Sequence, residues 1–173
     1  MFFYKRIMPI MAREMIKNLS LNNCIERAEK SINKAELDIV VIMLEYLDHI
    51  DRITKEAALS LYRRQLPSNH FFNVKKRIGY AFGVQISEDD LSFIFNKIIK
   101  ALFLSESISE IYGNDANMKH IIRKVIDKYI LVLGKSDQKL KMSVMGFYKG
   151  TLEWDMENSK LIAGLIKNKH FIF

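Results

Sequence analysis

Apolar residues recur at steps of three and four along most of the chain, which is the spacing of one face of an α-helix. The clearest run is Leu37, Val40, Val41, Leu44, Leu47 and Ile50. Asn33, followed three residues later by Glu36, has the pattern of a capping pair at the start of this run. The other faces are also apolar, with Ile39, Ile42, Met43 and Tyr46. We therefore expect a central helix from about Asn33 to Ile50 that other helices surround.

Residues that cap helices mark further helix starts. Thr54 and Ser68 each carry a hydroxyl that can accept a hydrogen bond from a free backbone N–H group of a first helical turn. Pro67 lacks the N–H that a continuing helix needs, so the helix from Thr54 should end near Gln65. Gly134 is typical of a left-handed helix C-cap. The further helices predicted in this way are 54–65, 68–82, 87–102, 114–133, 136–148 and 154–167.

These segments predict an all-α fold, a compact bundle of about seven helices. The sequence has no Asn-Gly or Asp-Gly hairpin signal. With 173 residues, of which 49% are hydrophobic and 27% charged, the chain is long enough to form a core. We expect one all-helical domain over residues 1–173, with a subdivision near residues 84–87 as the alternative.

The cysteine content, the length of the apolar runs and the spacing of the histidines predict an intracellular protein without a prosthetic group. Cys24 is the single cysteine, which favours a reducing compartment and predicts a cytoplasmic location. The apolar run of residues 39–44 is far shorter than the roughly 18 residues of a membrane-spanning helix, so no membrane span is expected. The four histidines do not pair at metal-ligand spacing, and no Gly-rich phosphate loop occurs. We expect no metal site and no cofactor.

A net charge of +7 at pH 7 and a pI near 9.4 favour an anionic partner. A chain rich in Lys, Asn and Ile is also what an AT-rich coding sequence produces, so the location of the charge is more informative than its total. Between Thr54 and Phe82, six cations stand against Glu56 alone. The same segment contains two predicted helices joined by a turn at 65–68, which are the features of a helix-turn-helix unit.

The second helix of that unit, 68–82, has two distinct sides when residues are placed at 100° intervals. Phe71, Val74, Ile78 and Ala81 share the side that should pack on the bundle. The opposite side has Asn, Lys, Arg and Tyr, which are residue types that contact bases and phosphates in the major groove. Together with the arginines that end the preceding helix, the candidate nucleic-acid-binding residues are Arg63, Arg64, Asn69, His70, Asn73, Lys76, Arg77 and Tyr80.

The sequence therefore favours a protein that binds DNA or RNA, with a role in regulation, such as transcription regulation, or in assembly. An ordinary solvated helix in an Asn- and Lys-rich protein would show the same residue types. That alternative stays open from the sequence alone.

The ends of the chain favour a rival function. Met1–Tyr4 and Phe171–Phe173 are apolar, although chain termini are usually polar. Such residues either pack on the bundle or form an apolar surface that another chain covers. A homo-oligomer or a larger complex would use them. The chain would then be a non-enzymatic interaction module, such as a complex subunit or an inhibitor of a partner protein.

Arg64 and His70 support one enzymatic hypothesis. The two residues have five others between them, and this spacing resembles the Arg-and-His signature of HEPN-type ribonucleases, which are all-α bundles. The resemblance covers only this pair, and the chain departs from the signature at Gln65 and Pro67. It implies that His70 transfers a proton and Arg64 holds the phosphate, commonly across a dimer interface. Because no other catalytic motif occurs, a non-enzymatic function is favoured.

Overall fold

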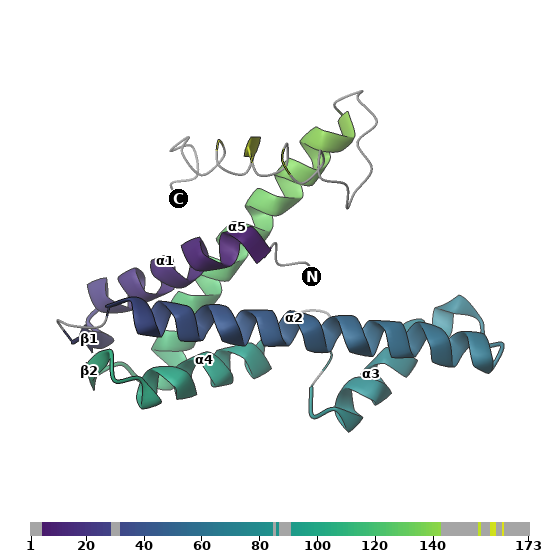
Figure 1. The fold of residues 1–173 in the computed structure, drawn as a ribbon, viewed down its shortest axis with the longest axis horizontal. Helices are drawn as coiled ribbons and strands as arrows, with labels where there is room; N and C mark the ends of the chain where they lie inside the picture. Colours follow the sequence, from purple (N-terminus) through teal and green to yellow (C-terminus); the bar gives the residue numbers. More distant parts are fainter. Residues whose placement is uncertain are drawn as a thin grey trace.

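The computed structural model describes residues 5–28, 32–84, 86 and 91–142, and the single residues 156, 160, 161 and 164. In this part of the chain the fold consists of five α-helices, two short 3₁₀ turns and two short strands (Figure 1). The elements are η1 (Lys5–Ile7), α1 (Met8–Leu21), β1 (Ile25–Arg27), α2 (Ile32–Arg63), η2 (Ser68–His70), α3 (Phe71–Ala81), α4 (Ser92–Leu104), β2 (Ile108–Ile111) and α5 (Asp115–Met142). The predominance of helix confirms the all-α class.

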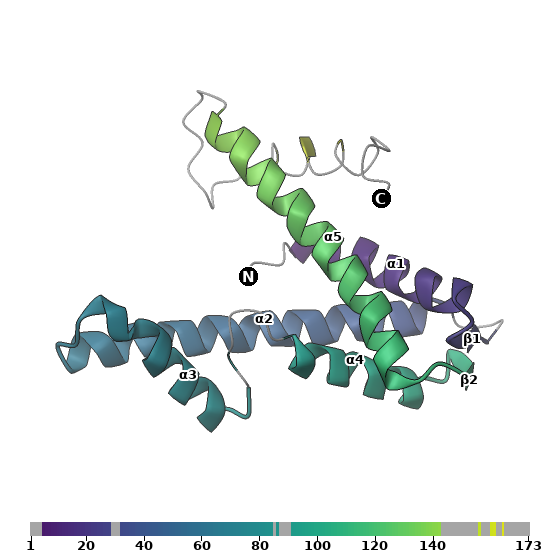
Figure 2. The same ribbon diagram turned by 180° about the vertical axis from the view of Figure 1, so that it is seen from behind.

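Helix α2 connects two parts of the molecule. Its 32 residues correspond to about 48 Å at 1.5 Å per residue. Helices α1 and α4 pack on its N-terminal half, and α3 packs on its C-terminal half (Figure 1). Helix α5 packs on α1 and α4 and crosses in front of them in Figure 2. We call the assembly of α1, α4, α5 and the N-terminal half of α2 the body.

The core of the body is rich in methionine. The thioether side chains of Met8, Met11 and Met15 from α1 are fully buried, as is Met43 from α2. Unbranched methionine side chains fill irregular gaps between helices that cross at different angles. Branched aliphatic residues from all four helices complete this core, among them Ile16, Leu19, Ile39, Ile94, Ile98, Leu102, Ile122 and Ile126.

A polar cluster joins α1 to α5 at the edge of this core. The Glu14 carboxylate of α1 accepts a hydrogen bond of 2.6 Å from the Lys128 ammonium group and one of 2.7 Å from the Tyr129 hydroxyl. The ring of Tyr129 is buried. Burial, together with the hydrogen bond to Glu14, raises the pKa of the Tyr129 hydroxyl well above its ordinary value. The cluster thus satisfies a buried hydroxyl and fixes the crossing of the two helices.

A two-stranded antiparallel sheet closes one end of the body. Ile25 of β1 pairs with Ile111 of β2, and the carbonyl of Cys24 accepts bonds from the N–H groups of Tyr112 and Gly113 at 2.9 and 3.0 Å. A Cβ atom on Gly113 would lie 2.7 Å from the Cβ of Cys24, so glycine is needed for this approach. The sheet was not predicted from the sequence.

The predicted helix that starts at Thr54 is wrong, because α2 continues through this residue without a break. The Thr54 hydroxyl donates a 2.6 Å hydrogen bond to the carbonyl of Ile50 within the helix. The threonine therefore bonds back to the preceding turn and does not cap a new one. Residues 33–63 form one helix where the sequence predicted two.

The predicted helix end at Gly134 is also wrong, since α5 continues to Met142 and includes the start expected at 136. Helix α1 was not predicted. The count of about seven helices therefore does not hold for the described residues. The expected helix start at Ser87 lies outside them, as do residues 143–148. Of the helix predicted at 154–167, the described residues are helical, but the rest lie outside.

The predicted cap at Ser68 is wrong, since this residue begins η2 without a side-chain cap and α3 begins only at Phe71. Two other helix limits are confirmed. Helix α2 ends at Arg63, two residues before the predicted limit, and Pro67 separates it from η2 and α3. At the start of α5, the Asn114 side-chain carbonyl accepts a 2.8 Å hydrogen bond from the N–H of Asn117, which is a helix N-cap.

The predicted core face of α2 needs correction. Leu37 and Val41 are 61% and 51% exposed, whereas Ile39 and Met43 are fully buried. The face of α2 that packs on α1 and α4 therefore differs from the face that the sequence pattern predicted. One side of α2 faces solvent and carries part of that apolar run, so the helix is not surrounded.

Candidate nucleic-acid interface

The predicted site residues lie on a part of the molecule that extends beyond the body. We call residues 52–84 together with Ile86 the arm. It consists of the C-terminal half of α2, the turn with η2, and α3, which folds back along α2 (Figures 1 and 2). Ile53, Val84 and Ile86 form a second hydrophobic cluster, against which Ile78 packs from the arm and Phe93 packs from α4 of the body.

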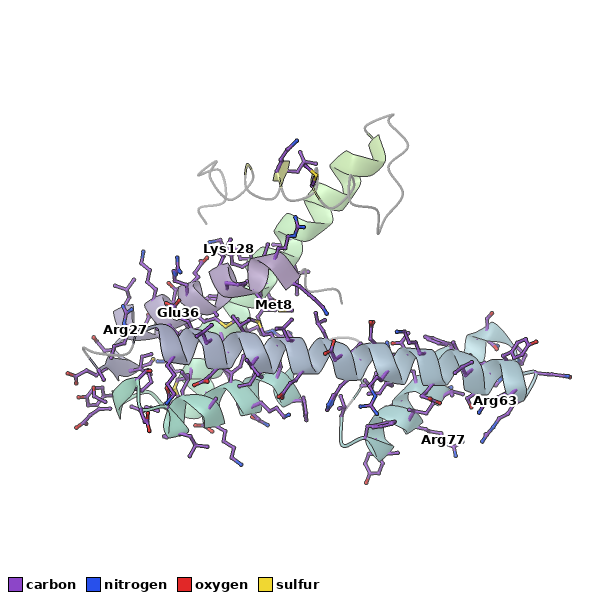
Figure 3. All side chains as sticks on the ribbon, viewed as in Figure 1. Met8, Arg27, Glu36, Arg63, Arg77 and Lys128 are labelled. Atoms are coloured by element: carbon purple, nitrogen blue, oxygen red, sulfur yellow. The ribbon has the colours of Figure 1, made fainter. Side chains whose placement is uncertain are left out.

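The turn at the tip of the arm has a defined backbone. Gln65 has a φ of 51°, in the left-handed region. This lets the N–H of Leu66 return to the carbonyl of Leu61 at 3.1 Å, which ends α2. Arg63, Arg64, Asn69 and His70 are exposed on either side of this turn, and Figure 3 labels Arg63 at the free end of α2. No contact joins Arg64 to His70 among the described residues.

Four of the predicted residues meet at a single hollow on α3. Asn73, Lys76, Arg77 and Tyr80 line an open depression of about 1120 Å³, together with Gly83, Val84 and Ile86. The four come from one helical face, as their spacing of three and four residues predicts. Figure 3 labels Arg77 on this helix, away from the body.

The other wall of the hollow is the segment that follows α3. Gly83 has a φ of 68°, which turns the chain back, and the N–H of Val84 bonds to the carbonyl of Gly79 at 2.9 Å. Val84 and Ile86 are buried and form an apolar floor. Gly79 is buried against them. These residues were not predicted from the sequence, although two glycines four residues apart at a helix end are a signal for such a return.

A second hollow, of about 980 Å³, lies at the turn. Arg63 is the only one of the predicted residues that lines it. The other lining residues were not predicted as part of a site, and they are Ala58, Leu61, Tyr62, Gln65, Leu66, Ser68 and Phe71. Arg64, Asn69 and His70 line neither hollow. The structure thus brings together Asn73, Lys76, Arg77 and Tyr80, and leaves the other four spread around the tip.

Ion pairs distinguish the arm from the rest of the chain. The six ion pairs found among the described residues all lie outside the arm. They are Lys5–Asp48, Arg13–Glu36, Lys34–Glu106, Lys97–Glu45, Arg123–Asp127 and Lys128–Glu14.

The cations of the arm have no such partners in the described part of the chain. Arg52 lies over the ring of Phe82, 5.5 Å from its centroid. The remaining six make neither an ion pair nor a hydrogen bond with described residues. These are Lys55, Arg63, Arg64, Lys75, Lys76 and Arg77. All but Lys75 are exposed, so the arm presents positive charge that nothing described here neutralises.

The described residues contain neither a cluster of metal ligands nor a membrane-spanning helix. Within the described ranges, no three His, Cys, Asp or Glu residues come together in a way that could hold a metal ion. Among the same residues, no helix is long and apolar enough to cross a membrane.

Comparison with known protein families matches residues 1–170 to the family described as "Protein of unknown function (DUF507)". The match covers nearly the whole chain, so the chain belongs to this family. A search among curated proteins finds no match. Since the family description names no activity, the case for a function depends on the arm.

Proposed function

We propose that this DUF507-family protein binds nucleic acid through the arm and acts in regulation or assembly. The observation that carries the proposal is the gathering of Asn73, Lys76, Arg77 and Tyr80 around one hollow. The Asn73 amide can bond to base edges, and the two cations can contact phosphate oxygens. The phenol ring of Tyr80 can stack on the face of a base.

The distribution of ion pairs supports an anionic ligand. A cation that is already paired gains less from a phosphate, because it must first give up its partner. Six described cations outside the arm are paired in this way, among them Arg123 and Lys128, whereas Lys76 and Arg77 have no ion-pair partner among the described residues. Each phosphate that these residues neutralise would release condensed counterions, and that release drives non-specific binding.

The helix-turn-helix interpretation is a finer form of the same proposal. Helix α3 would be the contacting helix, and the C-terminal half of α2 would be the helix that precedes it. Asn73 would then face base edges, where an amide can bond both polar atoms on the major-groove side of adenine. Arg63 and Arg64 at the tip would contact the phosphate backbone.

Replacing two cations at the hollow tests the proposal. The double variant Lys76→Gln, Arg77→Gln removes both charges and leaves shorter polar side chains that can still form hydrogen bonds. We expect it to weaken binding of a mixed-sequence oligonucleotide about ten-fold or more at low salt. The slope of log affinity against log salt should fall by roughly 0.9 for each lost contact to a duplex, or 0.7 to a single strand. Fluorescence anisotropy at several salt concentrations measures both quantities.

A matched control uses two exposed cations of the body, Lys100 and Lys124. The double variant Lys100→Gln, Lys124→Gln makes the same change in net charge. It should keep the wild-type slope, because these residues lie on α4 and α5, outside the arm. Equal losses in both double variants would mean that the protein attracts nucleic acid only through its overall charge, and the arm would not be the site.

A specific observation also favours a protein partner. Large apolar side chains are exposed on the arm beside its arginines, among them Leu59, Tyr62, Leu66, Phe72 and Phe82. Tyr and Arg are enriched at the centres of protein interfaces. Binding of this kind would tolerate added salt, whereas phosphate binding would fall steeply. The apolar chain ends invoked for the same function, Met1–Tyr4 and Phe171–Phe173, lie outside the described residues.

A further inference from the structure

We propose that the hollow on α3 binds unpaired bases of single-stranded nucleic acid, with the ring of Tyr80 as the surface on which a base stacks. This inference rests on the proposed function, narrows it from nucleic acid in general to single strands, and thereby competes with its helix-turn-helix form. DNA and RNA share the chemistry that the hollow would recognise.

The position of Tyr80 carries the inference. Its side chain is 86% exposed, although it adjoins a buried floor made by Val84 and Ile86. A tyrosine beside apolar surface normally packs against it, because burying an aromatic ring is worth more than leaving it in water. Here the ring stands at the rim of the hollow. It is therefore available to a flat ligand that enters from solvent.

The neighbours of Tyr80 complete a site for one nucleotide. Lys76 and Arg77 precede it by four and three residues, which places all three on one helical face. A base stacked on the ring would have its phosphate within reach of these cations. The Asn73 amide, one turn before these cations and about two turns before Tyr80, offers a donor and an acceptor to a polar base edge along the same face. A strand that follows a cationic groove and stacks on aromatic rings is the usual mode of single-strand binding.

The shape of the hollow favours a single strand over a duplex. A recognition helix must stand clear of its surroundings to enter the major groove, which is about 12 Å wide. In this chain the segment that carries Gly83 and Val84 turns back at the C-terminal end of α3 and lines the hollow beside the residues that would enter the groove. In a duplex, moreover, the faces of the bases are already stacked on one another and are not open to Tyr80.

The tip of the arm repeats this combination. Tyr62 is 83% exposed, and Arg63, which follows it, has no partner among the described residues. Both line the second hollow at the other end of α3. Helix α3 has 11 residues, so about 16 Å separates its two ends. That length fits a strand of a few nucleotides, which is within the range of single-strand binding sites.

The experiment compares the full-length protein on three labelled 20-mers of one sequence, as single-stranded DNA, single-stranded RNA and duplex DNA. Fluorescence anisotropy should show at least one single strand bound more tightly than the duplex. Tyr80→Leu should weaken single-strand binding by between roughly five-fold and a hundred-fold, the range for loss of one stacked base. It should leave the salt slope and the duplex affinity unchanged. Tyr80→Phe keeps the ring and should bind within about two-fold of wild type.

Phe103→Leu is the matched control, because Phe103 is an exposed aromatic residue of α4 in the body and should not affect binding. Duplex binding as tight as single-strand binding would overturn the inference, and so would wild-type affinity in Tyr80→Leu. In either case the proposed function would stand if Lys76→Gln, Arg77→Gln still weakened binding. Absence of binding to all three 20-mers would overturn both.

Discussion

At the scale of single residues, the hollow on the arm exists because residue 79 has no side chain. A Cβ atom on Gly79 would lie 2.8 Å from the carbonyl oxygen of Val84 and would also meet the side chain of Ile86. The backbone of Gly79 is helical, so alanine would suit the helix itself and would gain about 1 kcal/mol in helix propensity. The clash opposes this gain. Relief of this clash requires the Val84 segment to move away and expose two buried aliphatic side chains. Burial of each side chain contributes about 1.5–3 kcal/mol to stability.

We therefore predict that Gly79→Ala lowers the free energy of unfolding by about 1–3 kcal/mol, because the steric cost exceeds the propensity gain. Urea denaturation followed by circular dichroism measures the change. Gly83→Asn is the control. Gly83 has a positive φ with open space around it, and asparagine tolerates this backbone conformation, so the variant should stay within about 1 kcal/mol of wild type. A Gly79→Ala protein more stable than wild type would show that the Val84 segment does not pack as described.

These residues also show how far the sequence could predict the site. Asn73, Lys76, Arg77 and Tyr80 could be grouped because helical spacing is a local property. The opposite wall of the hollow could not be predicted, since it depends on the direction that the chain takes after the helix ends. The positive φ of Gly83 permits many directions, and only packing against Gly79 selects the one observed.

At the scale of elements, α2 shows the limit of local signals. Thr54 can cap a helix or bond back to the preceding turn within one, and both uses satisfy its hydroxyl. In the structure it donates to the Ile50 carbonyl, and the helix continues because its C-terminal half packs on α3. A sequence pattern over a few residues does not predict that contact between α2 and α3. The pairing of β1 with β2 was missed for a similar reason, since Ile25 and Ile111 are far apart in the sequence.

The orientation of α2 leads to a prediction about two neighbouring residues. Met43→Asp should lower the free energy of unfolding by several kcal/mol, because it places an unpaired charge at a fully buried position. Val41→Asp should change it by no more than about 0.5 kcal/mol, since Val41 faces solvent. Thermal unfolding of both variants tests the assignment. A large loss in Val41→Asp with little change in Met43→Asp would mean that the core face chosen from the sequence was the right one.

At the scale of the whole molecule, stability is distributed unevenly between body and arm. The smaller hydrophobic cluster consists of Ile53, Val84 and Ile86, and the partly buried residues around it include Ile78 of the arm and Phe93 of the body. The cluster of the body draws on four helices and the sheet. The arm also carries six cations that form no ion pair or hydrogen bond with described residues, and these repel one another when no ligand is bound. A region with few buried contacts and unbalanced charge opens at a lower free energy than the rest of the protein.

Amide hydrogen exchange should reveal this difference, and a ligand should reduce it. We predict that amides of α3 exchange at least about ten-fold faster than those of α4, whose inward face is buried in the body. A bound oligonucleotide stabilises only the state in which the arm is folded. At a free concentration of about 100 times the dissociation constant, it should slow exchange in α3 by roughly a hundred-fold. Exchange in α1 and α4 should change little, which serves as the internal control. Equal slowing throughout the chain would mean that arm and body open together, and that α2 transmits stability along its full length.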